Sequence, residues 1–350
     1  MVKRISFITY SIILFAHMTV GCSTDVANIP SLTFTPAPHV ETSIVKTSTP
    51  PPSPTLTPIP DASATPEMNP SGTIAMVGAH RTHLSLRLLN LENGAIQDVT
   101  GMADSSLTWS PDGQWIAFTG GISETQRGDI FIIKPDSNEL KRMTNSIYGE
   151  GHLSWSPNGK FVVYSYFSST SAFPESDLAL LDVDKEQTYL LTSTRGSEYR
   201  PTWSPDGKHI AYLFNQGNTP SELWVMDIET KSTEHILVDV PISERKIDWS
   251  PDGQWIAFIS PGVSDYCGDI FVVRPDGSEQ ERMTNLTGCA TVVTWSPDGK
   301  YLAFVGKDKI VSQGWRIYIM GAESKNIIPV TDEEELRIDD IDWSNISLSK

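Results

Sequence analysis

The clearest pattern in the chain is a short apolar stretch that ends in Trp-Ser, followed by a polar turn and a second apolar run. Trp115–Phe118 and Trp255–Phe258 are examples of the second run. Short runs rich in β-branched and aromatic residues, bounded by Pro, Asp and Gly, predict β-strands. In Ser-Pro-Asp-Gly, Pro presets one backbone angle and Gly accepts a left-handed one, so the chain reverses.

This pattern recurs along the chain as LTWSPDGQWIAF, LSWSPNGKFVVY, PTWSPDGKHIAY, IDWSPDGQWIAF, VTWSPDGKYLAF and a truncated IDWSN. The six Trp-Ser pairs begin at Trp109, Trp155, Trp203, Trp249, Trp295 and Trp343, with spacings of 46, 48, 46, 46 and 48 residues. A period in the mid-forties suits one four-stranded propeller blade. We expect these tryptophans to form a packing layer between blades.

Each repeat contains two further predicted strands, such as DIFIIKPD and a short run that ends near Thr144. The first repeat lacks a Trp-Ser strand, and nothing follows the last one. Ile74–Val77, Leu86–Leu91 and Ile96–Thr100 would therefore form one blade with Ile341–Ser344. The prediction is an all-β, six-bladed β-propeller over residues 71–350, closed by this split blade, which would remove open strand edges.

The repeated WSPDGK turn and the DI-apolar-PDG run resemble the WD40-like (PD40) repeat of the TolB propeller family. The resemblance covers about 280 of the 350 residues, although Asn158 replaces Asp in one copy and the first copy is degenerate. It implies a propeller that contacts other proteins. TolB also carries an N-terminal α/β domain with no counterpart here, so a role in the Tol complex is not implied.

The N-terminal segment has the order of a secretory signal peptide: Lys3 and Arg4, an apolar run of about 16 residues, and a small residue before Cys22. Residues 19–22, Thr-Val-Gly-Cys, resemble the bacterial lipobox, which implies cleavage after residue 21 and lipidation of Cys22. An ordinary signal peptide or an uncleaved anchor helix are the alternatives. The protein is expected to be exported to the cell envelope and to attach to a membrane through this lipid.

The segment that follows, residues 22–70, is rich in Pro, Thr and Ser. Residues 23–70 contain 11 Pro, 9 Thr and 6 Ser. Such a composition offers too little apolar surface to offset the entropy of folding, so it predicts a disordered tether. A proline-rich ligand for another domain is the alternative.

Charge and motifs restrict the function. The net charge is −17, which disfavours nucleic acid. The sequence has no Gly-x-Ser-x-Gly nucleophile elbow, and His80 and His83 lack a third ligand nearby, so we expect no catalysis, cofactor or metal. The favoured function is a monomeric binding module for a protein or peptide. A propeller lyase or hydrolase, an accessory subunit of a peptidase and a purely structural surface protein are the alternatives.

Two cysteines beyond Cys22 are Cys267 and Cys289, separated by 22 residues. Strand alternation places both in loops on one face of the disc, so a disulfide is expected in an oxidising compartment. Two free thiols are the alternative.

The same face carries the loops that vary most between repeats, and variable loops on a rigid scaffold often perform recognition. The third residue before each Trp forms a mixed ring there: Ser106, His152, Arg200, Lys246, Val292 and Asp340. With Arg245, the two basic members would form an arc for a carboxylate or an acidic peptide. His152, Arg200, Arg245, Lys246 and Asp340 are therefore the candidate binding residues, unless these side chains merely solvate the channel mouth.

Overall fold

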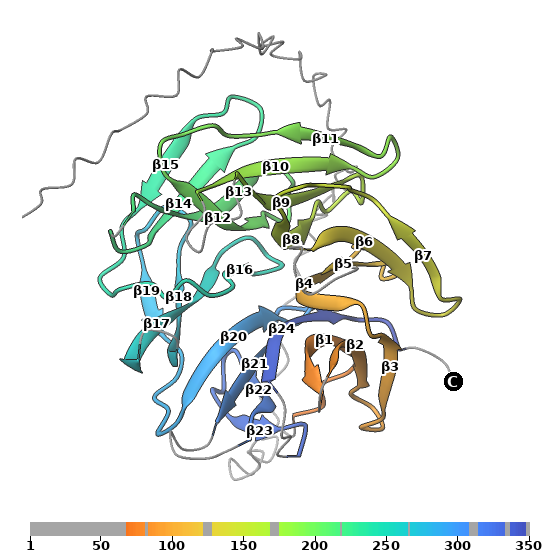
Figure 1. Ribbon diagram of the computed structural model, residues 1–350. Helices are drawn as coiled ribbons and strands as arrows, with labels where there is room; N and C mark the ends of the chain where they lie inside the picture. Colours follow the sequence, from red (N-terminus) through yellow and green to blue (C-terminus); the bar gives the residue numbers. More distant parts are fainter. Residues whose placement is uncertain are drawn as a thin grey trace, which may run out of the picture. The chain divides into compact units, whose positions relative to one another are not determined.

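The computed structural model describes residues 68–80, 83–121, 128–168, 175–217, 219–264, 267–307, 314–332 and 337–347. These residues form 24 β-strands, all paired antiparallel, arranged around a common centre (Figure 1). Among them, no helix has the length and apolar character needed to cross a bilayer.

Four of the sheets contain four strands each. The first has the order β24-β1-β2-β3, with β24 (Arg337–Ser344), β1 (Thr73–His80), β2 (His83–Asn90) and β3 (Ile96–Thr100). The second contains β4 (Ala103–Trp109), β5 (Ile116–Gly120), β6 (Asp129–Lys134) and β7 (Glu139–Arg142). The third contains β8 (Glu150–Trp155), β9 (Phe161–Phe167), β10 (Ser176–Asp182) and β11 (Gln187–Leu190). The fourth contains β12 (Ser197–Trp203), β13 (His209–Asn215), β14 (Glu222–Asp227) and β15 (Thr233–Ile236).

The fifth sheet has eight strands and consists of two runs of four. The first run is β16 (Asp248–Trp249), β17 (Ile256–Ser264), β18 (Cys267–Val273) and β19 (Gln280–Arg282). The second is β20 (Cys289–Trp295), β21 (Tyr301–Lys307), β22 (Arg316–Gly321) and β23 (Ile327–Pro329). The pairing of Gly268 with Ala290 joins β18 to β20. A single bridge therefore merges two runs that each have the pattern of the other sheets.

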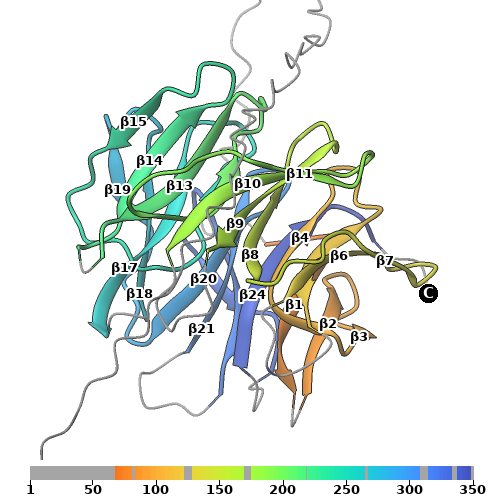
Figure 2. The same ribbon diagram turned by 45° about the horizontal axis from the view of Figure 1, so that its top comes forward.

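The strands nearest the centre come from each run of four in turn. β24 contacts β4, β4 contacts β8, β8 contacts β12, β12 contacts β16, β16 contacts β20, and β20 contacts β24. Figure 2 shows β4, β8, β20 and β24 side by side at the centre of the disc. β24, from the end of the sequence, pairs with β1 from Thr73↔Ser344 to Ala79↔Arg337.

The repeated turns share one set of hydrogen bonds. In the turn at residues 110–115, Ser110 Oγ donates to Asp112 Oδ1 (2.6 Å) and accepts from the backbone N–H of Trp115 (2.9 Å). Gly113 has φ +66°, a left-handed angle that side chains disfavour. Asn158 makes the same bond with its amide oxygen, to Ser156 Oγ at 2.8 Å. The substitution in that copy therefore preserves the turn.

The core lies between neighbouring runs of strands. One cluster packs β1 and β2 against β4–β6 and contains Trp109, and another packs β5 and β6 against β8–β10 and contains Trp155. The six repeated tryptophans are all buried, with 5–8% of their surface exposed. Burial of so large a side chain in each repeat contributes roughly 2–3 kcal/mol.

Candidate functional site

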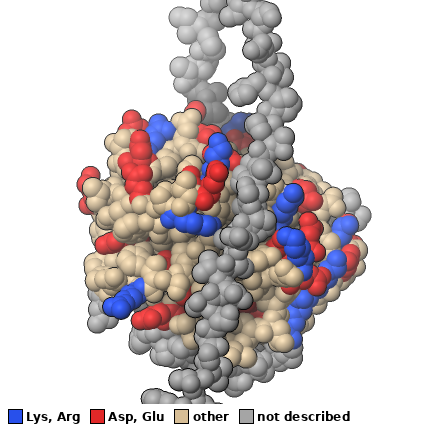
Figure 3. Space-filling view, turned by 90° about the horizontal axis from the view of Figure 1, so that it is seen from above, with Lys and Arg blue, Asp and Glu red and all other residues tan. Residues whose placement is uncertain are grey.

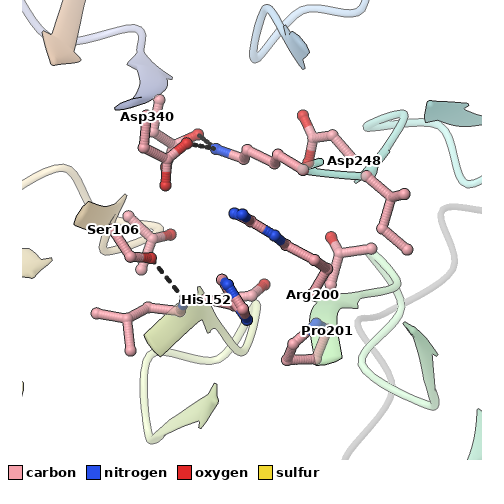
Figure 4. Close-up of a pocket in the computed structure, with 13 residues that line it drawn as sticks. Ser106, His152, Arg200, Pro201, Asp248 and Asp340 are labelled. Atoms are coloured by element: carbon pink, nitrogen blue, oxygen red, sulfur yellow. Dashed lines mark hydrogen bonds and ion pairs between the residues drawn. The ribbon is translucent and has the colours of Figure 1, made fainter. Parts of the chain in front are cut away.

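The inner strands enclose a small polar cavity at the centre of the molecule (Figure 4). Its volume is about 40 Å³. The side chains that line it include Ser106 and Thr108 from β4, His152 and Ser154 from β8, Arg200 and Thr202 from β12, Lys246 and Asp248 at β16, and Asp340 and Asp342 from β24. Asp340 and Asp342 lie two residues apart in a regular part of β24 and therefore face the same side.

His152 and Arg200 reach the cavity from irregular points in their strands. The pairing of β8 with β9 shifts register between Gly151 and Ser154, and that of β12 with β13 shifts between Tyr199 and Thr202. Both His152 and Arg200 have φ +56°, a left-handed angle that costs about 1–2 kcal/mol for a residue with a side chain. Bulges change the direction of side chains, and these two bulges direct the imidazole of His152 and the guanidinium of Arg200 toward the centre.

Lys246 is surrounded by acidic groups. Its Nζ lies 3.6 Å from Asp340 Oδ1 and 3.5 Å from Asp342 Oδ1, and donates to the carbonyl of Ile341 at 2.6 Å. Burial opposes the charge of Lys246, but the neighbouring carboxylates outweigh it and raise its pKa. Lys246 therefore remains charged and is neutralised within the protein.

The carboxylates of the cavity also link adjacent inner strands. Asp340 Oδ2 accepts from the backbone N–H of Leu107 (3.2 Å), and Asp342 Oδ2 from that of Trp109 (2.8 Å). Asp248 Oδ2 accepts from the N–H of Trp295 at 2.7 Å. Burial raises the pKa of Asp248 to about 6, against the effect of Lys246. Much of the acidic charge in the cavity therefore has a structural role.

Arg200 is the cation of the cavity that has an unused hydrogen-bond donor among the described residues. Figure 4 shows its guanidinium extended between His152 and Asp340. Its Nε is buried and has no hydrogen-bond partner among the described residues. Burial lowers the pKa of Arg200 to about 10, so it is still charged at neutral pH. Nearby, His152 Nδ1 lies 3.0 Å from Ser165 Oγ, which orients the imidazole.

The structure brings together most of the ring expected from the sequence. Ser106, His152, Arg200, Lys246 and Asp340 line the cavity. Val292 instead packs in an apolar cluster with residues of β21, β22 and β24. Arg245 is not among the lining residues.

Sequence reasoning missed the residue directly before each Trp, which includes Asp248 and Asp342. The period of two along a strand could have identified these positions, because they share a face with the predicted ring.

The size and charge of the cavity limit its chemistry. About 40 Å³ holds two or three water molecules and is far below the ~300 Å³ or more of typical small-molecule sites. The described part of the cavity can thus accept a terminal group, such as a carboxylate, and not a sugar ring.

Several predicted sites lie outside the described residues. These are Cys22, the central parts of the variable loops, and the side chains of His80, His83 and Cys267. Cys289 is described: it is 2% exposed and disulfide-bonded. On the face seen in Figure 3, Lys and Arg side chains lie interspersed with Asp and Glu.

Comparison with protein-family models identifies residues 167–344, just over half of the chain, as a TolB β-propeller (PD40) domain. The chain belongs to the TolB β-propeller family. The family match covers the later repeats, where the Ser-Pro-Asp-Gly turns are most regular. A search of curated protein sequences gave no match.

Solved structures with the same fold include TolB proteins. TolB from Acinetobacter baumannii superposes with a TM-score of 0.62 at 18% identity, over 78% of this chain and 66% of that protein, just under two thirds of its length. A protein assigned as TolB in Agrobacterium tumefaciens gives 0.57 at 22% identity, over 75% and 90% of the two chains. A chain of a nidogen/laminin complex gives 0.59 at 11% identity, over 77% and 97%. At these identities the likeness concerns the fold.

Proposed function

We propose that this chain is an exported TolB-like propeller that binds a protein or peptide partner, without catalysis of its own, through an acidic group that enters the central cavity. The observation that carries this proposal is the guanidinium of Arg200, which faces the cavity with a buried Nε that has no partner among the described residues. A buried donor without an acceptor is costly, and a ligand carboxylate would satisfy it.

Arg200 suits this role better than Lys246. Lys246 already contacts Asp340 and Asp342, so its charge is compensated. A guanidinium can donate two parallel hydrogen bonds to one carboxylate, which fixes the orientation of the ligand as well as its charge. His152 and Ser106, on neighbouring strands, line the same cavity and can donate further hydrogen bonds.

Crosslinking on intact cells followed by mass spectrometry tests this proposal. The wild-type protein should yield a reproducible partner, and Arg200→Glu should abolish its capture, because the variant places a carboxylate where the ligand carboxylate would bind. Lys300→Glu is the matched control: it also reverses one charge, and its side chain is 73% exposed beside a repeated turn. Loss of capture with Lys300→Glu, or full capture with a folded Arg200→Glu variant, would contradict the assignment.

We also propose that the propeller has six blades and is closed by β24. The eight-stranded sheet is then two blades joined at the bridge between Gly268 and Ala290. The pairing of β24 with β1, and the contacts that lead from β24 through the other inner strands to β20 and back, support closure.

The organisation of the rest of the chain is part of the same proposal. Residues 1–21 are a signal peptide, Cys22 carries the lipid, residues 22–70 are a tether, and residues 71–350 are the propeller. Such a tether would hold the propeller away from a membrane in the cell envelope, within reach of a partner.

For the disulfide of Cys289, we propose Cys267 as the partner. Gly268 pairs with Ala290, so the residues next to these two cysteines are opposite each other on β18 and β20. A bridge that closes a loop of this length stabilises a protein by about 3 kcal/mol in the loop-entropy model. Peptide mapping without reductant should recover a linked pair of peptides that contain Cys267 and Cys289. Recovery of both as free thiols, or of Cys289 joined to Cys22, would exclude this pairing.

A further inference from the structure

A second recess lies away from the central cavity, on the face that carries the Ser-Pro-Asp-Gly turns, which we name the turn face. It is a groove of about 400 Å³ between the sheet β12–β15 and the strands β16–β19. Trp249, His209 and Val225 contribute its aromatic and apolar lining, together with Pro205 and Pro275. Its volume lies within the range of sites that bind small molecules or single side chains.

The rim of this turn-face groove is acidic. Asp206, Glu234, Asp252 and Asp276 line it, and the only basic side chain in the described lining is His209. The turn carboxylates use Oδ1 for the turn itself: that of Asp206 accepts from Ser204 Oγ, and that of Asp252 from Ser250 Oγ, both at 2.6 Å. Among the described residues, these hydrogen bonds engage Oδ1, which leaves the Oδ2 atoms to accept from a ligand.

Two of these acidic groups, Asp206 and Asp276, have a lowered pKa and stay ionised at neutral pH. Partial burial opposes ionisation of Asp206, but the hydrogen bonds from Ser204 and Lys208 outweigh it and lower the pKa of Asp206. The hydrogen bonds within the turn, chiefly with Ser278, lower the pKa of Asp276. The groove therefore carries an excess of negative charge.

Trp249 forms the aromatic wall of the groove. Trp249 is 8% exposed, and its indole Nε1 has no hydrogen-bond partner among the described residues. This atom lies 3.9 Å from the point where a Cβ on Gly253 would stand, and Gly253 is itself a lining residue. The same atom of Trp109, Trp155, Trp203 and Trp295 also lacks a partner among the described residues, so this feature belongs to the repeat and does not by itself mark a ligand site. The ring of His209 stacks on Trp249 at 6.5 Å, which extends the aromatic surface.

In two other repeats, a cationic side chain of the protein itself lies over the aromatic ring that follows the turn. The residue directly after the turn is Trp255 in one repeat and Trp115 in another, and His209 occupies the same position here. The Arg274 guanidinium lies 3.9 Å from the centre of the Trp255 ring and donates to Glu279 Oε2 at 3.1 Å. Lys141 lies 5.0 Å from the centre of the Trp115 ring. In both, a cation covers the aromatic ring beside an acidic group.

The described lining of the groove contains no Lys or Arg side chain. His209 pairs across the sheet with Asp227, whereas the corresponding partner of Trp255, one residue beyond the pair Ile256↔Val273, is Arg274. An acidic residue thus stands where the neighbouring repeat has arginine, and Asp227 Oδ2 lies 3.9 Å from His209 Nε2. Lys208 and Arg274 act electrostatically on Asp206 and Asp276, so the chain compensates part of this negative charge and leaves the remainder for an external cation.

We propose that the turn-face groove binds an arginine side chain from a peptide segment of a partner protein. A planar guanidinium stacks on aromatic rings and donates to several carboxylates at once, which matches the lining of the groove. This site is separate from the central cavity and does not depend on the function proposed for it.

A titration with two matched peptides tests the proposal. The full-length protein is titrated with acetyl-Gly-Arg-Gly-amide and with the same peptide carrying citrulline, a neutral isostere of arginine, and binding is followed by ligand-detected NMR. The arginine peptide should bind, more weakly as salt is added, and the citrulline peptide should not. Equal binding of both peptides, or binding of neither, would overturn the assignment.

Variants locate the site. The double variant Asp206→Asn and Asp252→Asn removes two negative charges from the groove. It should keep both turns, because Asn158 already forms the same turn, where its Oδ1 accepts from Ser156 Oγ (2.8 Å) and from the N–H of Lys160 (3.0 Å). Affinity for the arginine peptide should fall about tenfold. Asp298→Asn makes the same change in a turn outside this groove and should leave affinity unchanged within about twofold. An equal loss in the Asp298→Asn protein would show that only overall charge matters and would refute the site.

Discussion

At the scale of single residues, the centre of the propeller is held by opposite charges that come from distant parts of the chain. Lys246 is separated from Asp342 by almost a hundred residues, and its side chain is only 14% exposed. Buried ion pairs add little net stability compared with apolar packing, but removal of one partner leaves the other charge buried and uncompensated. The cavity therefore depends on Lys246 more than on any surface lysine.

The variant Lys246→Met should lower the free energy of unfolding by about 3–5 kcal/mol, because Asp340, Asp342 and Asp248 lose their common counter-ion. Urea denaturation followed by tryptophan fluorescence measures this. Lys300→Met is the control, since its side chain is 73% exposed, and should change stability by less than about 0.5 kcal/mol. Equal stability of the two variants would show that the central ion pairs are not structural.

Another buried carboxyl group lies between β6 and β8. Glu150 is 5% exposed, its Oε2 accepts from the backbone N–H of Ile130 (3.2 Å), and it bonds with Thr144 Oγ1. Burial raises the pKa of Glu150 from 4.5 to about 7. Below about pH 4.5 both the folded and the unfolded chain carry this proton. As pH rises toward 7, the unfolded chain releases it first, so unfolding becomes more favourable.

The wild-type protein should therefore lose stability relative to Glu150→Gln between about pH 4.5 and pH 7, by up to ~3 kcal/mol. Urea midpoints measured across this range for both proteins give the difference. Glu139→Gln, on the exposed strand β7, should give a profile parallel to wild type. A Glu150→Gln profile that is also parallel to wild type would indicate that Glu150 titrates normally.

At the scale of elements, the N- and C-terminal strands depend on each other. β24 lies between β1 and β4, and its Ile341 is fully buried while Trp343 Nε1 donates to the carbonyl of Ser71 at 3.0 Å. Two neighbouring strands thus lose partners if β24 is absent, and the unpaired edge of β1 becomes open to association.

Deletion of residues 339–350 should lower the melting temperature by more than about 10 °C, because the protein loses the free energy of burying several side chains. Differential scanning calorimetry measures the shift. A synthetic peptide of residues 337–350 added to the truncated protein should restore most of it, since it can pair with β1. An unchanged melting temperature after truncation would contradict the proposed closure by β24.

At the scale of the whole molecule, the chain combines a TolB-family propeller with an N-terminal region of different composition. The family match and the fold concern the propeller alone. The proposed anchor depends on the order of residues around Cys22, and a single lipid-modified cysteine would determine where the whole protein is found.

Cys22→Ala should move the protein from the membrane fraction to the soluble fraction of the cell, because the acceptor of the lipid is absent. Fractionation and immunoblotting measure this, with Ser23→Ala as the control that should remain in the membrane fraction. If the Cys22→Ala protein stays with the membrane and keeps its N-terminal segment, an uncleaved anchor helix is the correct alternative.

Local patterns were sufficient to predict most of the secondary structure. The apolar runs predict β5 and β17 at nearly their observed starts, because β-branched and aromatic residues between Pro-Asp-Gly turns favour strands independently of context. One strand is shorter than its repeat suggests: β16 contains only Asp248 and Trp249. The segment before it still bonds to β17 but leaves the register of β16, with the N–H of Ser243 donating to the carbonyl of Ile259.

The sequence predicted where the candidate site lies, but it did not predict which of its charged groups pair with one another. Arg200 and Lys246 stand at the same position before the repeated Trp, so the sequence alone predicted that both approach the centre, as it predicted the repeat and the turns. The tertiary structure decided how each is paired: Lys246 meets Asp340 and Asp342 from the far end of the chain, while Arg200 Nε has no hydrogen-bond partner among the described residues. Contacts between strands so distant in sequence depend on how the strands come together, and local spacing carries no information about them.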